Sequence, residues 1–315
     1  MKEIKIGTRG SRLALIQTEL VANRLSTGLS GESGLSFTPV IFRTRGDILH
    51  DVPLNQVGGK GVFSGEIEQA LVAGTVELAV HSAKDLPSAI HPDTELLTVL
   101  PREDPADVLI MPRDRGYSIP GIIGTGSPRR KFLIRQLYPE AAFRLLRGNV
   151  PTRLEKLQKG EYEAIILAAA GIRRLKLDHD GRFDYVRLPP ESFIPSGGQG
   201  MIALQIRKDH PLLSSVKRLV HYETQTALDA ERLVLRELGA GCHEAAGVYA
   251  AFVSGVSDSA PQKAVFNIRY FLFRHGRLCR GCISGDAGRY RELAEKLLES
   301  CSSGRYEPFF SGGLL

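Results

Sequence analysis

Short strand-like segments alternate with longer helix-like segments along the first hundred residues, and this alternation limits the possible folds more than any other feature. Hydrophobic residues recur every three or four positions in the helix-like segments, whereas the strand-like segments are short apolar runs. Such alternation predicts an α/β fold with a parallel sheet, in which ligands bind at the carboxyl ends of the strands. The expected strands are 4–6, 37–42 and 77–80, and the expected helices are 11–26 and 63–73.

Two segments rich in proline or glycine, 101–105 and 189–200, divide the chain. The 315 residues suggest two or three domains of roughly 100–150 residues each. Between the crossings we expect strands 108–111, 122–123, 143–146 and 164–167 and helices 127–137 and 150–158. After the second crossing we expect strands 201–206, 248–253, 265–273 and 276–283 and helices 224–238 and 286–299, of which the later ones form a smaller α/β unit.

Composition excludes several classes of protein. No apolar run approaches the roughly 20 residues that a membrane-spanning helix needs, and the N-terminal segment lacks the apolar core of a signal peptide. Four cysteines without an export signal predict a reduced, cytoplasmic protein rather than a disulfide scaffold. Cys279 and Cys282 have the spacing of a redox motif or half a zinc site. They lie in an expected strand without a second pair, so we interpret them as structural and expect no metal.

The net charge of +6 is concentrated in one window, residues 129–153. The window holds seven basic residues and one acid, Glu140, so it carries the whole excess and leaves the rest of the chain neutral. A uniformly basic coat for nucleic acid would not show this pattern. The chain has 29 arginines and 12 lysines, and arginine favours bidentate recognition of carboxylate or phosphate groups.

Two expected helix starts in this window carry arginines. Arg129 and Arg130 follow a Ser127-Pro128 start, and Arg153 follows an Asn149 cap. Cations at a helix N-terminus oppose the helix dipole unless an anion offsets them, which indicates a ligand with several carboxylates or phosphates. Surface arginines paired with nearby acids are the alternative. The turns 6–12 and 123–129 also resemble each other, each placing Gly-Thr, Ser and Arg before a helix, although two capping turns can be alike by chance.

Two short segments bring reactive groups together. Residues 81–87 place a hydroxyl, an ammonium and a carboxylate (Ser82, Lys84 and Asp85) at the end of an expected strand, where a solvated Lys–Asp pair is the simpler interpretation. Cys242 lies in a small-residue loop beside His243, which can lower the pKa of its thiol, but a loop cysteine is more often incidental. The glycine-rich runs 58–61 and 197–200 can approach a ligand closely, and neither is a phosphate or dinucleotide motif.

Taken together, these motifs resemble the hydroxymethylbilane synthase family, also called the porphobilinogen deaminase family. The resemblance extends over about residues 3–250, in one consistent order, and the last sixty residues add little to it. The motifs that carry it lie at residues 7–11, 44–47, 58–63, 81–87, 102–105, 124–130, 146–153, 198–200, 230–232 and 241–242.

The resemblance implies an α/β fold with two lobes like those of type II periplasmic binding proteins around a cleft, plus a small α/β C-terminal domain. The first lobe would comprise residues 1–100 with 201–218, and the second would comprise 104–195. The C-terminal domain, residues 222–315, would carry the cysteine to which the cofactor is attached.

The implied activity is that of a transferase in tetrapyrrole and heme biosynthesis. Four porphobilinogen molecules would be joined head to tail with release of ammonia, and hydrolysis would then release hydroxymethylbilane. The chain would grow on a dipyrromethane cofactor bound through a thioether to Cys242. Asp85 would be the catalytic aspartate, whose ionised carboxylate would accept hydrogen bonds from pyrrole N–H groups and stabilise the positive charge that develops as ammonia leaves. The family also implies a cytoplasmic monomer without nucleic-acid or membrane partners.

Further residues match binding positions of the family, including the backbone of 168–171. The cofactor would be bound by Ser82, Lys84, Thr125, Ser127, Arg129, Arg130, Arg147 and Gln199. The substrate carboxylates would be bound by Arg9, Ser11, Lys60 and Arg153. Four residues depart from the family's usual pattern, Gly65, Gly126, Gln205 and Ala245. Of these, Ala245 and Gly65 put details of the cofactor loop and of the active-site cover in doubt.

Two other functional classes remain as alternatives. The first is an anion-binding module, similar to a solute-binding protein, that kept the lobes without the catalysis. The second is a basic RNA-binding protein, which the confined charge and the aromatic content of 7% disfavour.

Overall fold

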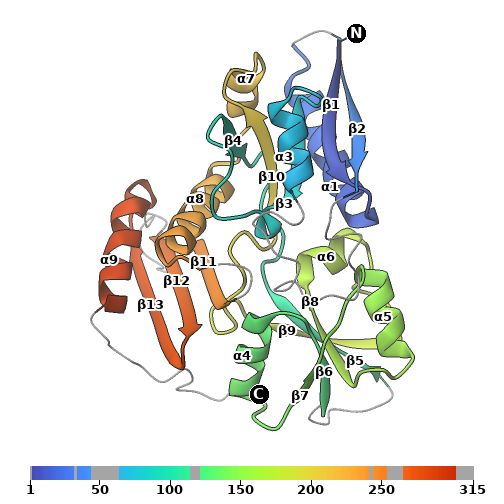
Figure 1. Cartoon of the computed structure of the whole chain (residues 1–315), viewed down its shortest axis with the longest axis vertical. Coiled ribbons are helices and arrows are strands. Elements are labelled where there is room, and N and C mark those ends of the chain that lie inside the picture. The colour runs from blue at the N-terminus through green and yellow to red at the C-terminus, as the bar shows by residue number, and fades with distance from the viewer. Residues whose placement is uncertain are drawn as a thin grey trace, which may run out of the picture.

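Three β-sheets organise the chain (Figure 1). The structure, a computed structural model, describes residues 2–31, 34–43, 64–113, 121–240, 244–253 and 265–302. Two of the sheets have five strands each and form the parts that we call lobe 1 and lobe 2, and the third sheet has three strands.

Lobe 1 has the strand order β2-β1-β3-β10-β4. Its buried core combines side chains such as Ile4, Ile6 and Leu78 from the sheet with Val21 and Leu25 from α1. The strands are β1 (Lys2–Arg9), β2 (Leu35–Phe42), β3 (Leu78–Ser82), β4 (Thr94–Leu97) and β10 (Ile202–Arg207), and the helices are α1 (Arg12–Gly28), α3 (Gly65–Val72) and α7 (Leu213–Lys217).

Lobe 2 has the corresponding order β7-β6-β8-β5-β9. Its helix α6 packs against α1 of lobe 1, so these two helices meet where the lobes adjoin (Figure 1). The strands are β5 (Asp107–Pro112), β6 (Ile122–Gly124), β7 (Ala142–Arg144), β8 (Ala164–Ala168) and β9 (Phe183–Leu188), and the helices are α4 (Pro128–Leu137), α5 (Val150–Gln158) and α6 (Ala169–Arg174).

The C-terminal part is an antiparallel sheet covered on one face by α8 and α9 (Figure 1). On its other face Phe132 of α4 stacks on Phe271 and Phe273, which attaches the sheet to lobe 2. The elements are α8 (Tyr222–Glu237), β11 (Ala245–Val253), β12 (Val265–Arg274), β13 (Arg277–Gly285) and α9 (Tyr290–Ser302). The expected α/β class, with two lobes and a small third unit, is confirmed.

The five-stranded sheets are mixed, which corrects the expectation of a parallel sheet. β10 enters lobe 1 from lobe 2 and runs antiparallel to β3 and β4, whereas β5 enters lobe 2 from lobe 1 and runs antiparallel to β8 and β9. Each of these strands arrives by a crossing rather than through a covering helix, so its direction is reversed. The sequence patterns also did not predict β4, β9, α6 or α7.

The two crossings lie side by side, because the Glu103 N–H donates to the Gly200 carbonyl at 3.1 Å. Gly200 has a φ of +88°, and a Cβ there would lie 2.3 Å from the Glu103 oxygen, so only glycine fits this approach. The expected domain boundaries stay a prediction. The assignment of strands to the three sheets agrees with them.

The cysteines differ from the expectation of a reduced chain, since Cys279 is disulfide-bonded. Cys282 is free and exposed, so the two cysteines of this spaced pair are not bonded to each other. Of the helices in the described ranges, none combines the length and the apolar character needed to cross a membrane.

Candidate active site

Asp85 lies at the carboxyl end of β3, on a single 3₁₀ turn formed by Ala83–Asp85. The turn is bonded to the residue that precedes β10, because the Ala83 N–H donates to the Met201 carbonyl at 3.1 Å. Gly198, at a φ of +75°, also lies directly against it, and a Cβ at Gly198 would come within 2.9 Å of the Ala83 backbone. The glycine-rich crossing therefore supports the turn that presents Asp85.

A pocket in lobe 1 opens beside Asp85. The closest cation is Arg9, whose Nη1 lies 4.0 Å from the Asp85 Oδ2. Ser82 donates to the Gln17 Oε1 at 3.0 Å, which fixes the amide of Gln17 at the pocket wall. Ser11 caps α1 by accepting from the Ala14 N–H, so its hydroxyl lies at a helix start. The lining residues are Arg9, Ser11, Leu13, Ala14, Gln17, Ser64, Val80, His81, Ser82 and Asp85.

His81 is buried and lines this pocket, and its Nε2 has no hydrogen-bond partner among the residues that the structure describes. Burial lowers the pKa of His81 to about 4, although Gln205 beside it and Glu68 act in the opposite direction. The imidazole is therefore neutral at physiological pH. It places a polar but uncharged group beneath the Asp85 turn.

Lys84 lies on the opposite side of the Asp85 turn, facing lobe 2. Burial lowers the pKa of Lys84 to about 8, with Arg130 as the second cause, whereas Asp85 and Asp107 raise it. Among the described residues no carboxylate lies within ion-pair distance of its ammonium. A buried, unpaired ammonium costs free energy, so this position favours an anionic ligand.

Arg129 and Arg130, at the start of α4, are both bonded to Asp107 at the start of β5. Arg129 Nη2 lies 2.7 Å from Oδ2 of Asp107, and Arg130 Nη2 lies 2.7 Å from Oδ1. Burial alone would raise the pKa of Asp107, but the two guanidinium groups outweigh it and hold the pKa at about 2. Both arginines also donate to backbone carbonyls, of Ile194 and Ile166. The first two cations of the window thus have partners within the chain.

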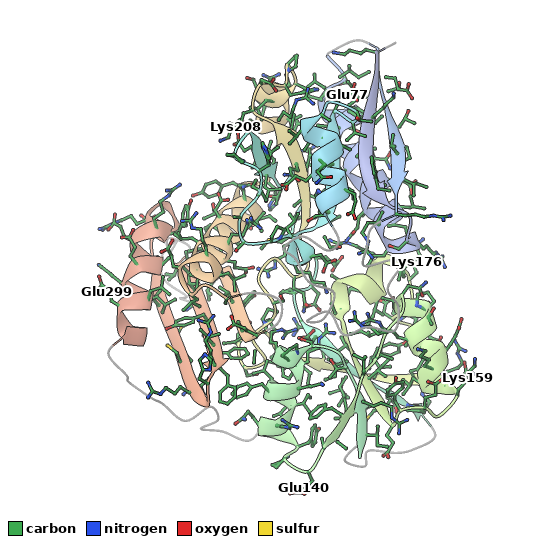
Figure 2. All side chains as sticks on the ribbon, in the orientation of Figure 1. Glu77, Glu140, Lys159, Lys176, Lys208 and Glu299 are labelled. Carbon is green, nitrogen blue, oxygen red and sulfur yellow. The ribbon has the colours of Figure 1, made fainter. Side chains whose placement is uncertain are left out.

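Arg147 and Arg153 are the other two arginines of the window that were expected to bind a ligand. We call Arg129, Arg130, Arg147 and Arg153 together the basic wall. Arg153 is held by a 2.7 Å bond to the Gly148 carbonyl, and burial followed by the charges of Arg130 and Arg147 lowers its pKa to about 10. Burial also lowers the pKa of Arg147. The one acid of the window, Glu140, lies at the end of lobe 2 that points away from lobe 1 (Figure 2).

The remaining predicted groups lie at the start of α4 and in the second crossing. Ser127 caps α4 by accepting from the Arg130 N–H, and Thr125 accepts from the Ser127 N–H. Gln199 donates to the Pro105 carbonyl and to Asp107, while its buried Oε1 has no partner in the part of the chain that the structure describes. Both lobes therefore contribute polar groups around the Asp85 turn. Cys242, Lys60 and the run 58–61 lie outside the described residues.

Three residues of this site were not predicted. Asp107 is a single acid at the start of an apolar strand, a pattern that signals a buried ion pair. Gln17 lies four residues after Leu13 and four before Val21, on a face of α1 expected to be apolar, where Gln17 and Thr18 are buried instead of Leu20. His81 was noted only as part of its motif.

This geometry defines an α/β protein that binds an anionic ligand between two lobes, around an acid on a short turn. Within the described ranges the Lys84 ammonium has no carboxylate partner and the Gln199 Oε1 has no donor, and both suit a dipyrrole, which offers carboxylates and pyrrole N–H groups. The residues present therefore fit the expected dipyrromethane cofactor.

Comparisons with known proteins give the family. The family model described as "Porphobilinogen deaminase, dipyromethane cofactor binding domain" matches residues 4–215. A porphobilinogen deaminase of Roseiflexus castenholzii is 40% identical over 94% of this chain and 96% of its own, and one of Syntrophus aciditrophicus is 43% identical over 94% and 95%. The chain belongs to the porphobilinogen deaminase family, and the expected transferase class and dipyrromethane cofactor are confirmed. Among solved structures, the periplasmic VFT2 domain of Bordetella pertussis BvgS matches with a TM-score of 0.41 and 13% identity, over 72% of this chain and 92% of that one.

Proposed function

We propose that the chain is a hydroxymethylbilane synthase, which joins four porphobilinogen molecules and releases the linear tetrapyrrole by hydrolysis. Each condensation bonds the methylene carbon of one unit to the free α-carbon of another, and ammonia leaves with the proton that the α-carbon gives up. The observation that supports this most directly is the Asp85 carboxylate, which lies between Arg9 in lobe 1 and the cations of lobe 2.

Asp85 is the catalytic residue of this proposal. Its side chain is 38% exposed at the mouth of the pocket, so it can reach a ligand without losing its place on the turn. Positive charge develops on the pyrrole as ammonia leaves, and a fixed carboxylate stabilises such charge more strongly than mobile water does. Pyrrole N–H groups can donate to the same carboxylate.

The cations bind the side-chain carboxylates of the pyrroles. Arg9 and Arg153, with Ser11 and Lys60, serve the incoming substrate, and Lys84 and Arg147 serve the cofactor together with Ser82, Thr125, Ser127 and Gln199. Each charged hydrogen bond contributes about 1.5–3 kcal/mol, and several similar sites allow a growing polyanion to shift between additions. Arg129 and Arg130 hold the start of α4 through Asp107, and in this proposal they bind the cofactor from that fixed position.

The cofactor is attached to Cys242, and it supplies the pyrrole α-carbon on which the chain grows. We also propose that the protein is a cytoplasmic monomer that binds neither nucleic acid nor membrane. The confined basic window supports this, because Arg129, Arg130, Arg147 and Arg153 supply most of its charge and belong to the proposed ligand site, whereas Arg135 and Arg144 are exposed elsewhere on lobe 2.

The intact mass of the purified protein tests the proposal. We expect an adduct of two pyrrole units that is absent from Cys242→Ser. We also expect Asp85→Ala to fold normally and to lose nearly all turnover of porphobilinogen. An anion-binding module without catalysis would show an unmodified mass and no turnover, and an unmodified mass with full activity would exclude the cofactor assignment.

A further inference from the structure

His81 is a polar side chain of the Asp85 pocket to which the proposed function gives no role. It lies on β3, and more than nine-tenths of it is buried. Of its two ring nitrogens, Nε2 is the one shut off from solvent without a hydrogen bond in the described part of the chain. Nδ1 makes no hydrogen bond to the described residues either, but it is not enclosed in this way. Nδ1 is therefore the nitrogen that reaches the pocket.

The side-chain amide of Gln205 lies beside this ring, and its orientation is fixed. Gln205 is two residues beyond the β10 residue that pairs with His81, so both side chains lie on the same face of the sheet. The Gln205 Nε2 donates to the Glu68 Oε1 at 2.7 Å and to the Thr94 Oγ1 at 2.8 Å. The same Glu68 oxygen also accepts from the His91 N–H at 3.0 Å, so Glu68 acts as an acceptor. The amide nitrogen must therefore face Glu68, and the amide oxygen must face away from it.

This orientation of Gln205 decides which nitrogen of His81 carries the proton. The Gln205 Oε1 and the His81 Nε2 are both buried, and within the described ranges neither has a partner in ideal geometry. Burial lowers the pKa of His81 to about 4, and hydrogen bonding with Gln205 is the largest influence in the opposite direction. An amide oxygen can only accept, so the neutral ring carries its proton on Nε2. The lone pair of Nδ1 is then left for the pocket.

The charges around the ring favour a cation on its pocket side. Glu68 and Asp85 both act to raise the pKa of His81, and Arg9 acts to lower it less strongly than either acid. Together these three groups stabilise positive charge at this position, yet burial keeps the imidazole itself neutral. A neutral acceptor among charges that favour a cation suits a ligand that brings a cation with N–H groups.

We propose that His81 is a further substrate-binding residue, whose Nδ1 accepts a hydrogen bond from the ammonium of the incoming porphobilinogen while Gln205 positions the ring. This inference rests on the proposed function, which supplies the substrate. Arg9 then faces a carboxylate, Asp85 faces the pyrrole N–H and His81 faces the ammonium. One pocket thus offers a complementary partner to each polar group of the substrate.

A neutral acceptor also suits the chemical step that follows. The bond between the methylene carbon and the nitrogen breaks with its electron pair on nitrogen, so ammonia leaves neutral and the pyrrole keeps the positive charge. The nitrogen must therefore stay protonated until the bond breaks. With a pKa of about 4, His81 binds the ammonium without taking its proton.

Binding of a substrate carboxylate is the alternative role for a histidine in this pocket. It needs a donor at the pocket, which is either an Nδ1–H or an imidazolium. The Gln205 oxygen opposes the first by holding the proton on Nε2, and burial opposes the second. The two roles therefore predict opposite positions of the ring proton.

The position of that proton is the first test. We expect ¹⁵N NMR of the holoenzyme at neutral pH to show His81 neutral and protonated on Nε2, with its resonances assigned by their loss in His81→Asn. His210 is an internal reference, because its Nδ1 accepts from the Leu212 N–H and this requires the same tautomer. Gln205→Leu should give His81 a mixture of tautomers. Thr94→Val, which removes only the second acceptor of the amide, is the control and should leave the tautomer unchanged.

The selectivity between two ligands is the second test, again with holoenzyme. The probe is the analogue of porphobilinogen with a neutral hydroxymethyl group in place of the aminomethyl group, measured as a competitive inhibitor. We expect His81→Leu to raise KM for porphobilinogen about ten- to a hundredfold, the loss expected for one hydrogen bond to a charged group. The inhibition constant of the analogue should stay nearly unchanged. His81→Asn keeps an acceptor at the position of Nδ1, so its KM should stay within about threefold of the wild type.

Three results would overturn the ammonium contact. They are a wild-type His81 protonated on Nδ1, equal losses for porphobilinogen and the analogue in His81→Leu, and a His81→Asn variant as impaired as His81→Leu. If the leucine variant does not fold, Gln205→Leu replaces it, with a smaller loss for porphobilinogen alone as the expected result and equal losses as the contrary one. An unchanged tautomer in Gln205→Leu would refute the positioning role of Gln205.

Failure of the proposed function looks different. A wild-type enzyme that does not turn over porphobilinogen would refute that function, whereas the ring proton of His81 can still be located by NMR. Normal turnover with a ring proton on Nδ1 would refute only the role of His81.

Discussion

The Nη2 of Arg129 lies 2.7 Å from the Oδ2 of Asp107, so an arginine predicted to bind a ligand carboxylate binds a carboxylate of the chain itself. The side chain of Asp107 is fully buried, and Arg130 shares the same acid. One acid thus fixes two cations at the start of α4, close enough to Lys84 for all three to affect its pKa. Contacts within the chain therefore set the positions of these two arginines without a ligand.

Replacing Asp107 by Asn should destabilise the protein by about 3–5 kcal/mol, because two buried arginines would lose their counter-charge. Equilibrium denaturation by urea measures the change. Asp184→Asn, which breaks a more exposed pair with Arg113, is the control and should cost at most about 1 kcal/mol. An equal decrease in the free energy of unfolding in the two variants would show that the buried cluster contributes no more to stability than the exposed pair.

The same acid predicts a pH dependence. The pKa of Asp107 is held at about 2, below its usual value of 3.8, so its ionised form is stabilised in the folded state. Its contribution to stability is complete above about pH 4 and is lost as the pH falls toward about 2. The unfolding free energy of the wild type should therefore fall more steeply over this range than that of Asp107→Asn. Parallel curves would contradict the assignment.

Lys84 predicts an alkaline limit to cofactor loading. Burial lowers its pKa to about 8, so before the cofactor is attached it loses the charge that binds carboxylates as the pH rises through 8. We expect the rate at which protein made without porphobilinogen gains the cofactor, followed by intact mass, to fall above this pH. A guanidinium does not titrate in this range, so the Lys84→Arg variant should lose that limb of the profile, whatever its absolute rate. An unchanged limb would assign it to another group.

Replacing Arg147 by Leu should impair elongation. The variant keeps the apolar stem but removes a cation from the outer wall, so intermediates bound to the enzyme should accumulate and be visible by native mass spectrometry. Arg144→Leu is the control, since Arg144 is exposed on β7 and donates to the Glu161 carbonyl. The same distribution of intermediates in both variants would show that Arg147 does not bind the growing chain.

Glu231 joins the C-terminal part to both crossings between the lobes. It is fully buried in α8 and accepts from Arg102 at 2.7 Å, from the Gly198 N–H at 2.6 Å and from the Ala250 N–H at 2.8 Å. Glu231→Gln should lower the free energy of unfolding by about 3–5 kcal/mol, because the Arg102 guanidinium loses its counter-charge. Glu237→Gln, whose partner Arg236 is exposed, should be near neutral.

The sequence predicted those parts of the fold whose hydrophobic spacing is local. α4 begins at Pro128 after the Ser127 cap, as expected, because Ser accepts from the first free N–H groups and Pro suits the first turn. β4 and β9 are pairings whose partners lie far away in the chain, so no local pattern marks them. The direction of β10 depends on the crossing between lobes, which period-two spacing does not encode.

The sequence predicted those site residues whose role follows from their own position in the chain. It could not predict the role of a residue that depends on a binding partner far away in the sequence. Asp85 and Lys84 follow directly from a strand end. The partners of Arg129 and Arg130 could not be predicted, because a cation at a helix start is equally compatible with a ligand or with a distant acid such as Asp107. Gln17 turns toward the pocket because the Ser82 hydroxyl donates to it there, against the apolar pattern of its helix.

The return of β10 to lobe 1 has a consequence for the order in which the chain folds during synthesis. The strands of lobe 2 are all made by Leu188, whereas the sheet of lobe 1 lacks the strand between β3 and β4 until Arg207 has left the ribosome. The part that begins second is therefore the first that can complete its sheet. Until then β2, β1 and β3 form a sheet with an unpaired edge at β3, and β4 has no partner strand, while the sheet of lobe 2 is already complete.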